Sequence, residues 1–155
     1  MANYQTDNYS QVPFNGAYGN KSVGHASFAS IAAVNGSAGF ANGDTFDIMR
    51  LPGGAKVLSG FIYMGSSAAA TSTLVVGIKY ADGTSTGGTT GTAVLVAGTA
   101  SAIVASHQGY AFRFTPFTND VDTIVYATWL SPGAPTGATG VPMDVVIDYQ
   151  ATGTK

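Results

Sequence analysis

Few residues of this 155-residue chain can do acid–base or nucleophilic chemistry. The sequence holds two histidines, His25 and His107, eight acidic residues that are all aspartate, and no cysteine. Hydrolytic triads place a histidine between a nucleophile and a carboxylate, and neither histidine lies in a nucleophile motif such as Gly-x-Ser-x-Gly. Because histidine is often found at protein surfaces, we interpret both as solvated or strand-end residues and assign them no catalytic role.

Six of the aspartates lie close together in the sequence as the pairs Asp44/Asp47, Asp120/Asp122 and Asp144/Asp148. Glycoside hydrolysis needs two carboxylates, and a hard cation such as Ca²⁺ needs about six to eight oxygen ligands. Aspartate also favours turns, through hydrogen bonds from its side chain to the backbone, and the segment around Asp120 has too few local oxygen donors for a calcium site. We therefore predict turn and surface roles for all three pairs, with no catalytic residue, metal or cofactor. An aspartate hydrolase is the weakest alternative.

Charge is scarce in this sequence and is not clustered. Charged residues make up 9% of the chain, with 6 Lys and Arg and a net charge of −2, against about 25% in an ordinary soluble domain. So few cations cannot neutralise a row of phosphates, and nucleic-acid binding is not expected. No apolar stretch approaches the roughly 20 residues of a membrane span. The start, Met1 to Asp7, lacks the features of a secretory signal, so we expect no membrane partner and synthesis in a cytoplasm.

The apolar stretches alternate as β-strands do. The chain has no glutamate, and glycine or β-branched residues interrupt every window that could form an amphipathic helix. From Met143 to Tyr149, apolar residues at every second position alternate with Asp144 and Asp148, which is the period of a half-buried strand. The predicted strands are 27–34, 45–50, 57–64, 74–80, 93–97, a stretch around 103, 111–115, 123–130 and 143–149. Short strands joined by Gly and Pro loops predict an all-β fold, an antiparallel, jelly-roll-like β-sandwich of about eight strands.

Two neighbouring stretches predict finer detail. Between 45 and 50, Phe46 and Ile48 share one face of a strand and Met49 lies on the other. The strand ends in a Pro52-Gly53 sequence, which predicts a type II turn with Pro at its second position. The next strand, 57–64, is apolar on both faces, which predicts that both are covered.

The first 22 residues differ from the rest of the chain. They are rich in Asn and Gln yet contain the aromatic residues Tyr4, Tyr9, Phe14 and Tyr18. We predict an extended N-terminal arm, too polar and irregular to be a strand, followed by a single sandwich domain over 23–155. An aromatic segment that cannot form its own core docks on another surface, here a neighbouring subunit or a larger particle. Trp129 is either a further exposed contact residue or part of the core.

Several short motifs resemble small virion proteins of tailed bacteriophages. They are Leu51-Pro52-Gly53-Gly54-Ala55-Lys56-Val57-Leu58, Thr73-Leu74-Val75-Val76-Gly77 and Asp122-Thr123-Ile124-Val125. Over residues 44–150 the chain resembles a capsid decoration or head auxiliary protein. It departs at Ile78 to Asp82, where a more acidic turn is expected. The resemblance implies a jelly-roll-like sandwich, a homo-oligomer, a position on the outside of the head, the major capsid protein as partner, and no catalytic residues.

The sequence thus leads to a non-enzymatic structural protein of a tailed phage, most specifically a capsid decoration (cement) protein that stabilises the head shell. The alternative is a carbohydrate-binding β-sandwich module, or a tail or fibre component, in which Trp129 and exposed tyrosines stack on sugar rings. Aromatic surface residues serve a subunit interface and a sugar platform equally well, so both hypotheses stand at this point.

Overall fold

The computed structural model describes the residues 3–6, 9, 19–28, 42–64, 73–82, 94–99, 109–112, 116–118, 120–130 and 143–152. Within these ranges the chain forms strands and no helix, so the predicted all-β class is confirmed. The strands are β1 (Asn3–Gln5), β2 (Lys21–Phe28), β3 (Thr45–Leu51), β4 (Ala55–Met64), β5 (Thr73–Tyr80), β6 (Val94–Thr99), β7 (Tyr110–Ala111), β8 (Phe117–Thr118), β9 (Thr123–Leu130) and β10 (Met143–Ala151).

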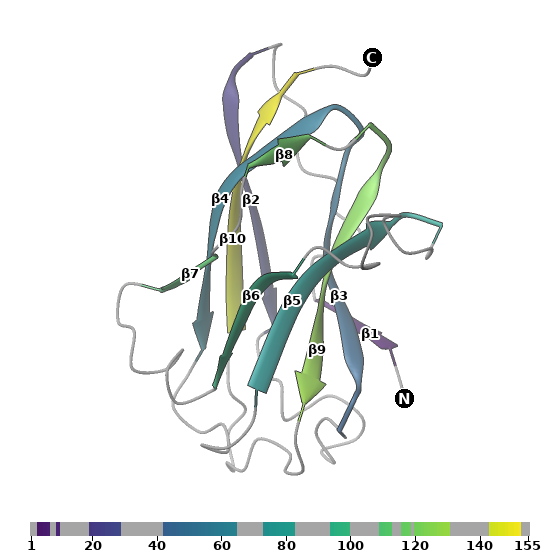
Figure 1. Cartoon of the computed structure of the whole chain (residues 1–155), viewed down its shortest axis with the longest axis vertical. Coiled ribbons are helices and arrows are strands. Elements are labelled where there is room, and N and C mark those ends of the chain that lie inside the picture. The colour runs from purple at the N-terminus through teal and green to yellow at the C-terminus, as the bar shows by residue number, and fades with distance from the viewer. Residues whose placement is uncertain are drawn as a thin grey trace.

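The strands form two sheets that lie face to face (Figure 1). Sheet A has the order β1-β3-β9-β5-β6, and sheet B has the order β2-β10-β4-β7, with β8 also paired to β4. Five antiparallel pairings are nested along the chain: β2 with β10, β3 with β9, β4 with β7, β4 with β8, and β5 with β6. A long hairpin wound over into two sheets produces this order, which is the jelly roll. The predicted jelly-roll-like sandwich is confirmed.

One alternate row of side chains on each sheet makes the core. In β10 every second residue, from Met143 through Val145, Ile147 and Tyr149 to Ala151, is buried, and the residues between them are half-exposed. The alternation predicted for 143–149 is therefore confirmed. Strand β5 shows the same period, because Leu74, Val76 and Ile78 are buried in the core. Both strands lie inside their sheets, where one face meets the opposite sheet.

Strand β4 differs from its prediction at a β-bulge. Asp148 of β10 lies opposite Ser59, but the next residue of β10, Tyr149, lies opposite Val57, so Leu58 is an extra residue in β4. The bulge shifts the alternation by one residue. Val57 and Ile62 are both buried, although a regular strand would place them on opposite faces. The expectation that both faces are covered was wrong, because the outer face of β4 is open enough to leave Tyr63 37% exposed.

A second bulge corrects the prediction for β3. Asp47 lies opposite Tyr126 and Met49 lies opposite Val125, so Ile48 is the extra residue. Phe46, Ile48 and Met49 are consequently all buried in the core, and the assignment of Met49 to the other face was wrong.

The turn after β3 also lies one residue later than predicted. The Ala55 N–H donates a hydrogen bond to the Pro52 carbonyl at 3.2 Å, which makes Pro52 the first residue of the turn and Gly54 the third. Gly54 has a φ of +78°. A positive φ at the third position is the mark of a type II turn and favours glycine there. The type II turn is therefore present, with Pro52 at the first position and not at the second.

Trp129 and Leu130 are adjacent on β9 and provide a matched test of the core. Trp129 is 0% exposed and Leu130 is 39% exposed. We expect Trp129→Ala to lower the free energy of unfolding by about 3–5 kcal/mol, the range for removal of a large buried side chain. Leu130→Ala should change it by less than about 1 kcal/mol. Urea unfolding followed by circular dichroism measures both, and equal losses would contradict the assignment of Trp129 to the core.

Candidate functional site

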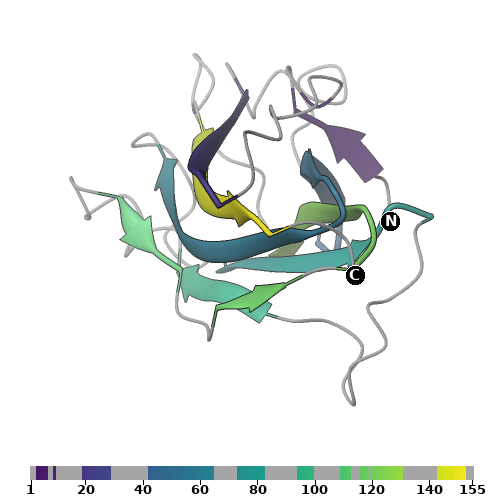
Figure 2. The ribbon, with the colours of Figure 1, turned by 90° about the horizontal axis from the view of Figure 1, so that it is seen from above.

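The N-terminal segment docks on the edge of sheet A. Asn3, Tyr4 and Gln5 pair in parallel with Thr45, Phe46 and Asp47 of β3, and Figure 2 shows β1 beyond β3 at the edge of its sheet. The prediction of an arm without a strand was therefore wrong for residues 3–5. The edge of β3 offers backbone donors and acceptors that a polar sequence can satisfy as well as an apolar one.

The bulge in β3 extends this docking beyond β1. The Thr6 N–H donates to the Asp47 carbonyl at 3.0 Å, and the Thr6 hydroxyl donates to the Ile48 carbonyl at 2.5 Å. Thr6 is only 4% exposed. A bulge interrupts the regular ladder, so the carbonyl of the extra residue needs a donor from elsewhere. Thr6 supplies it.

A partly buried ion pair lies on the outer face of sheet A beside this segment. The Lys79 Nζ of β5 lies 2.7 Å from the Asp47 Oδ1 of β3 and 5.3 Å from the centre of the Tyr126 ring, so the ammonium has both a carboxylate and an aromatic partner. Burial raises the pKa of the Tyr9 hydroxyl, and the charge of Asp47 raises that pKa further, while Arg50 acts in the opposite direction. Tyr9 is thus half-buried beside these charged groups, as docking of the segment requires.

The outer face of sheet B is a mixed apolar and acidic surface. Val23 of β2 is exposed beside Asp148, and Tyr63 of β4 is exposed beside Asp144. Both carboxylates have partners on β2: the His25 Nε2 lies 3.0 Å from the Asp144 Oδ1, within hydrogen-bonding distance, and the Lys21 Nζ lies 3.0 Å from the Asp148 Oδ2 as an ion pair. Because these carboxylates are paired within the sheet, the exposed apolar side chains are the main groups through which this face could contact a partner.

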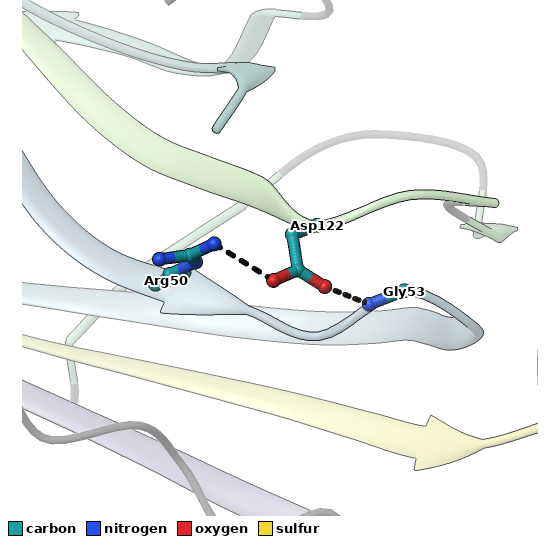
Figure 3. Close-up of polar contacts among 3 residues, drawn as sticks. All are labelled: Arg50, Gly53 and Asp122. Atoms are coloured by element: carbon teal, nitrogen blue, oxygen red, sulfur yellow. Dashed lines mark hydrogen bonds and ion pairs between the residues drawn. The ribbon is translucent and has the colours of Figure 1, made fainter. Parts of the chain in front are cut away.

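The third polar cluster ties the β3–β4 turn to the start of β9 (Figure 3). The Asp122 Oδ2 lies 2.9 Å from the Arg50 Nη2, and its Oδ1 accepts the Gly53 N–H at 2.8 Å. A side chain at Gly53 would fit tightly, since a Cβ there would lie 3.0 Å from the Asp120 carbonyl oxygen. Both Asp122 oxygens hold the fold together, so this carboxylate has a structural role.

The aspartate pairs show how far the prediction of turn and surface roles held. It is confirmed for Asp120 and Asp122, at the start of β9, and for Asp144 and Asp148, on the outer face of β10. For Asp44 the turn position is confirmed, because it follows the turn at 42–43 and directly precedes β3, but its side chain is only 3% exposed. For Asp47, which lies within β3 and is 5% exposed, the prediction was wrong. Asp47 tolerates burial because Lys79 neutralises it.

The predicted contact residues are placed as follows. Tyr4 lies in β1 and Tyr9 beside Asp47, whereas Phe14 and Tyr18 lie outside the described residues. Trp129 is fully buried, so its core interpretation is confirmed and its side chain is not an exposed anchor. Sequence reasoning missed the exposed apolar residues Val23, Tyr63, Val121 and Leu130. For Leu130 the signal was the alternation along β9, where the adjacent Trp129 is buried.

The described part of the chain contains no group of three or more His, Cys, Asp or Glu placed to hold a metal ion. The same part has no helix long and apolar enough to cross a bilayer. His107 and the predicted strand around 103 lie outside it. His25, predicted to be solvated, is exposed in the middle of β2 with Asp144 as its partner.

Comparison with known proteins finds similarity of structure and not of sequence. No protein-family model and no curated protein matches this sequence. A chain in a structure described as the capsid of Ralstonia phage GP4 aligns with a TM-score of 0.59 and 18% identity, over 99% of each chain. A chain in the acidic stable capsid structure of Helicobacter pylori bacteriophage KHP30 aligns with a TM-score of 0.57 and 17% identity, over 88% of this chain and 92% of that one. At these identities the similarity shows a shared fold.

The Asp122 cluster predicts unequal effects of two substitutions. Arg50→Ala removes a half-exposed ion pair, which contributes about 0–1 kcal/mol. Asp122→Ala removes that pair and also leaves the part-buried Gly53 N–H without its acceptor, so we expect a loss of about 1–3 kcal/mol. Chemical denaturation of both variants measures the difference. An Arg50→Ala loss equal to or larger than that of Asp122→Ala would contradict the role given to the Gly53 hydrogen bond.

Asp148 predicts a dependence of stability on acid. Burial alone raises the pKa of this carboxyl, but hydrogen bonds from Ser59 and Lys21 and the charge of Lys21 outweigh burial, so its pKa is lowered on folding. A carboxyl of this kind stabilises the fold above its unfolded pKa of about 3.9, and the stabilisation is lost as the pH falls through the folded value.

The substitution Asp148→Asn tests this dependence. We expect it to cost about 1 kcal/mol in the free energy of unfolding at neutral pH, and the cost to shrink as the pH falls to about 2, because protonation of the wild-type carboxyl removes the same interaction. Urea midpoints of both proteins at the two pH values give the comparison. A difference between wild type and variant that persists unchanged in acid would disprove a lowered pKa.

Proposed function

We propose that this chain is a non-enzymatic structural virion protein of a tailed phage, a decoration protein that binds the major capsid protein on the outer surface of the head and stabilises the shell. The observation that supports this most is the alignment of its jelly roll over nearly the whole length of chains from two phage capsid structures. Chains that align at this coverage have about the same length as this one, so the likeness extends to the size of the component as well as to its fold.

The polar clusters of the described residues also support a structural role. Asp47, Asp122 and Asp148 are each engaged with cations or backbone donors that hold strands together. A catalytic carboxylate needs access to substrate, whereas these three are engaged by groups of the fold itself. Burial of Trp129 removes one of the aromatic groups on which the sugar-binding alternative was based, which leaves that alternative with exposed tyrosines such as Tyr63.

The aromatic residues of the N-terminal segment are the proposed contacts. Tyr4 and Tyr9 belong to the part that docks on a jelly roll through β3. Phe14 and Tyr18 lie in the polar stretch that follows, and we assign them to contact with the shell. Aromatic side chains supply large contact areas at interfaces, and in a chain with 9% charged residues they are better suited than ion pairs to form such a contact.

Cosedimentation with heads assembled from the shell protein of the same phage, without this chain, tests the proposed function. We expect saturable binding at a fixed ratio to shell subunits and heads that withstand a higher temperature when saturated. The mass of the free protein, measured by light scattering, gives its oligomeric state. Absence of binding at concentrations far above that of the shell subunits would reject the decoration role and favour a tail or fibre component.

The double substitution of Phe14→Ser with Tyr18→Ser tests the proposed contacts. Loss of two aromatic contacts that contribute about 1 kcal/mol or more each should weaken binding to heads at least about tenfold, with unchanged unfolding by urea. Val121→Ser is the matched control, because Val121 is 52% exposed and lies outside the N-terminal segment. Binding by the double variant equal to that of the control would show that the shell contact lies elsewhere.

A further inference from the structure

The outer face of sheet B presents an aromatic ring beside a carboxylate. Tyr63 of β4 and Asp144 of β10 are register partners, and both point away from the core, because the residues on either side of each are buried. Tyr63 is 37% exposed and the Asp144 side chain is 46% exposed. His25 of the neighbouring strand β2 has its Nε2 3.0 Å from the Asp144 Oδ1. We call Tyr63, Asp144 and His25 the Tyr63 cluster, and Figure 1 shows their three strands side by side.

The fold holds the Tyr63 ring in place through a glycine. Gly109, which directly precedes β7, has a φ of +85°, and a Cβ built on it would lie 2.7 Å from the Tyr63 Cζ. The ring therefore lies against the main chain, in space that the side chain of any other residue would fill. An aromatic ring that is fixed before binding loses little conformational freedom when a ligand contacts it. The Tyr63 ring is thus a preformed contact surface.

Asp144 keeps one oxygen for a ligand. Within the described residues its hydrogen-bond partner is His25, at Oδ1, and its Oδ2 has none. Asp148, further along the same face, differs, because Lys21 and Ser59 both contact its carboxylate. Hydroxyl groups that donate to a carboxylate form short, strong hydrogen bonds. The Asp144 Oδ2 is therefore the acceptor that the cluster offers to a ligand.

These groups match a neutral sugar better than other ligands. A sugar ring has an apolar C–H face, which packs on an aromatic ring, and hydroxyls at its edge, which donate and accept hydrogen bonds. An anionic ligand would be repelled by Asp144 and by Asp148 on the same strand. An apolar protein surface placed here would bury the Asp144 Oδ2 without a donor, which costs free energy. A sugar hydroxyl supplies that donor.

We infer that the Tyr63 cluster binds a neutral polysaccharide, with one sugar ring on Tyr63, a hydroxyl of that ring on the Asp144 Oδ2, and the next unit beside His25. The three residues come from three adjacent strands and span about 10 Å, two strand spacings, across the sheet. That span is longer than one sugar ring and suits consecutive units of a chain. The inference goes beyond the proposed function, because it uses none of the residues assigned to the shell contact and does not depend on binding to a head.

Titration of the full chain with oligosaccharides tests the inference. The probes are neutral oligosaccharides of glucose, galactose, mannose, rhamnose and N-acetylglucosamine, with sialyllactose and oligogalacturonate as acidic probes. Calorimetry and NMR follow binding. We expect at least one neutral probe to bind with a millimolar or lower dissociation constant, and neither acidic probe to bind.

Variants at Tyr63 separate stacking on the ring from other contacts. Tyr63→Ala should weaken binding of that neutral probe at least about fivefold, whereas Tyr63→Phe, which keeps the ring, should change it less than about twofold. Leu130→Ala is the matched control, because Leu130 is 39% exposed on the other sheet, and it should leave binding unchanged. Urea unfolding checks that each variant is folded.

A second pair of variants tests the carboxylate. Asp144→Asn should weaken binding about threefold, because the sugar hydroxyl then donates to a neutral acceptor. Asp148→Asn makes the same change on the same strand, outside the Tyr63 cluster, and should leave the dissociation constant as in the wild type.

Two results would overturn the inference: no neutral probe binds at millimolar concentration, or Tyr63→Ala binds as tightly as the wild type. Loss of binding to heads by Tyr63→Ala, without sugar binding by the wild type, would assign this face to the shell contact and would also overturn it.

Discussion

Burial of one alternate row of side chains on each sheet is the interaction on which this structure depends. The chain has no cysteine for a disulfide and little charge for ion-pair networks, so stability comes from apolar groups removed from water between the two sheets. The row on β10, from Met143 to Ala151, lies at the centre of sheet B between β2 and β4. Trp129 and Leu74, which are register partners on β9 and β5, belong to the facing row of sheet A. Each polar cluster lies outside this layer or at its end.

The requirement for that layer explains which parts of the fold were predictable. An amino-acid sequence displays the period of two directly, so β5, β9 and β10 were predicted within about two residues of their observed ends, where assignments of strand limits normally differ. A β-bulge leaves no comparable signal, because it is one extra residue in an otherwise regular pattern. The bulges at Ile48 and Leu58 therefore caused the wrong faces in β3 and β4. The pairing partners of the strands were not predicted, and the jelly roll was inferred from the number of strands and from a resemblance of motifs.

The candidate site was less predictable, since its geometry depends on contacts between distant segments. The aromatic residues near the N-terminus signalled docking, but the docking of residues 3–9 depends on main-chain groups of β3 and on a bulge carbonyl. Backbone hydrogen bonding is nearly independent of residue type, so a polar strand of three residues such as β1 has no recognisable pattern. Trp129 illustrates the opposite case. Its residue type suggested an interface, whereas its position on the inward face of β9 places it in the core.

The bulge in β3 connects the core to the surface contacts. With one residue added at Ile48, the strand keeps Phe46 and Met49 both in the apolar layer and still directs Asp47 outward to Lys79. A regular strand would place Phe46 and Met49 on opposite faces. The same extra residue exposes a carbonyl at the sheet edge, and Thr6 satisfies it. An unpaired edge is a general hazard because it pairs with other chains. The N-terminal segment covers that edge in a defined register. The bulge that keeps Phe46 and Met49 in the core therefore also determines where β1 and Thr6 dock on the sheet.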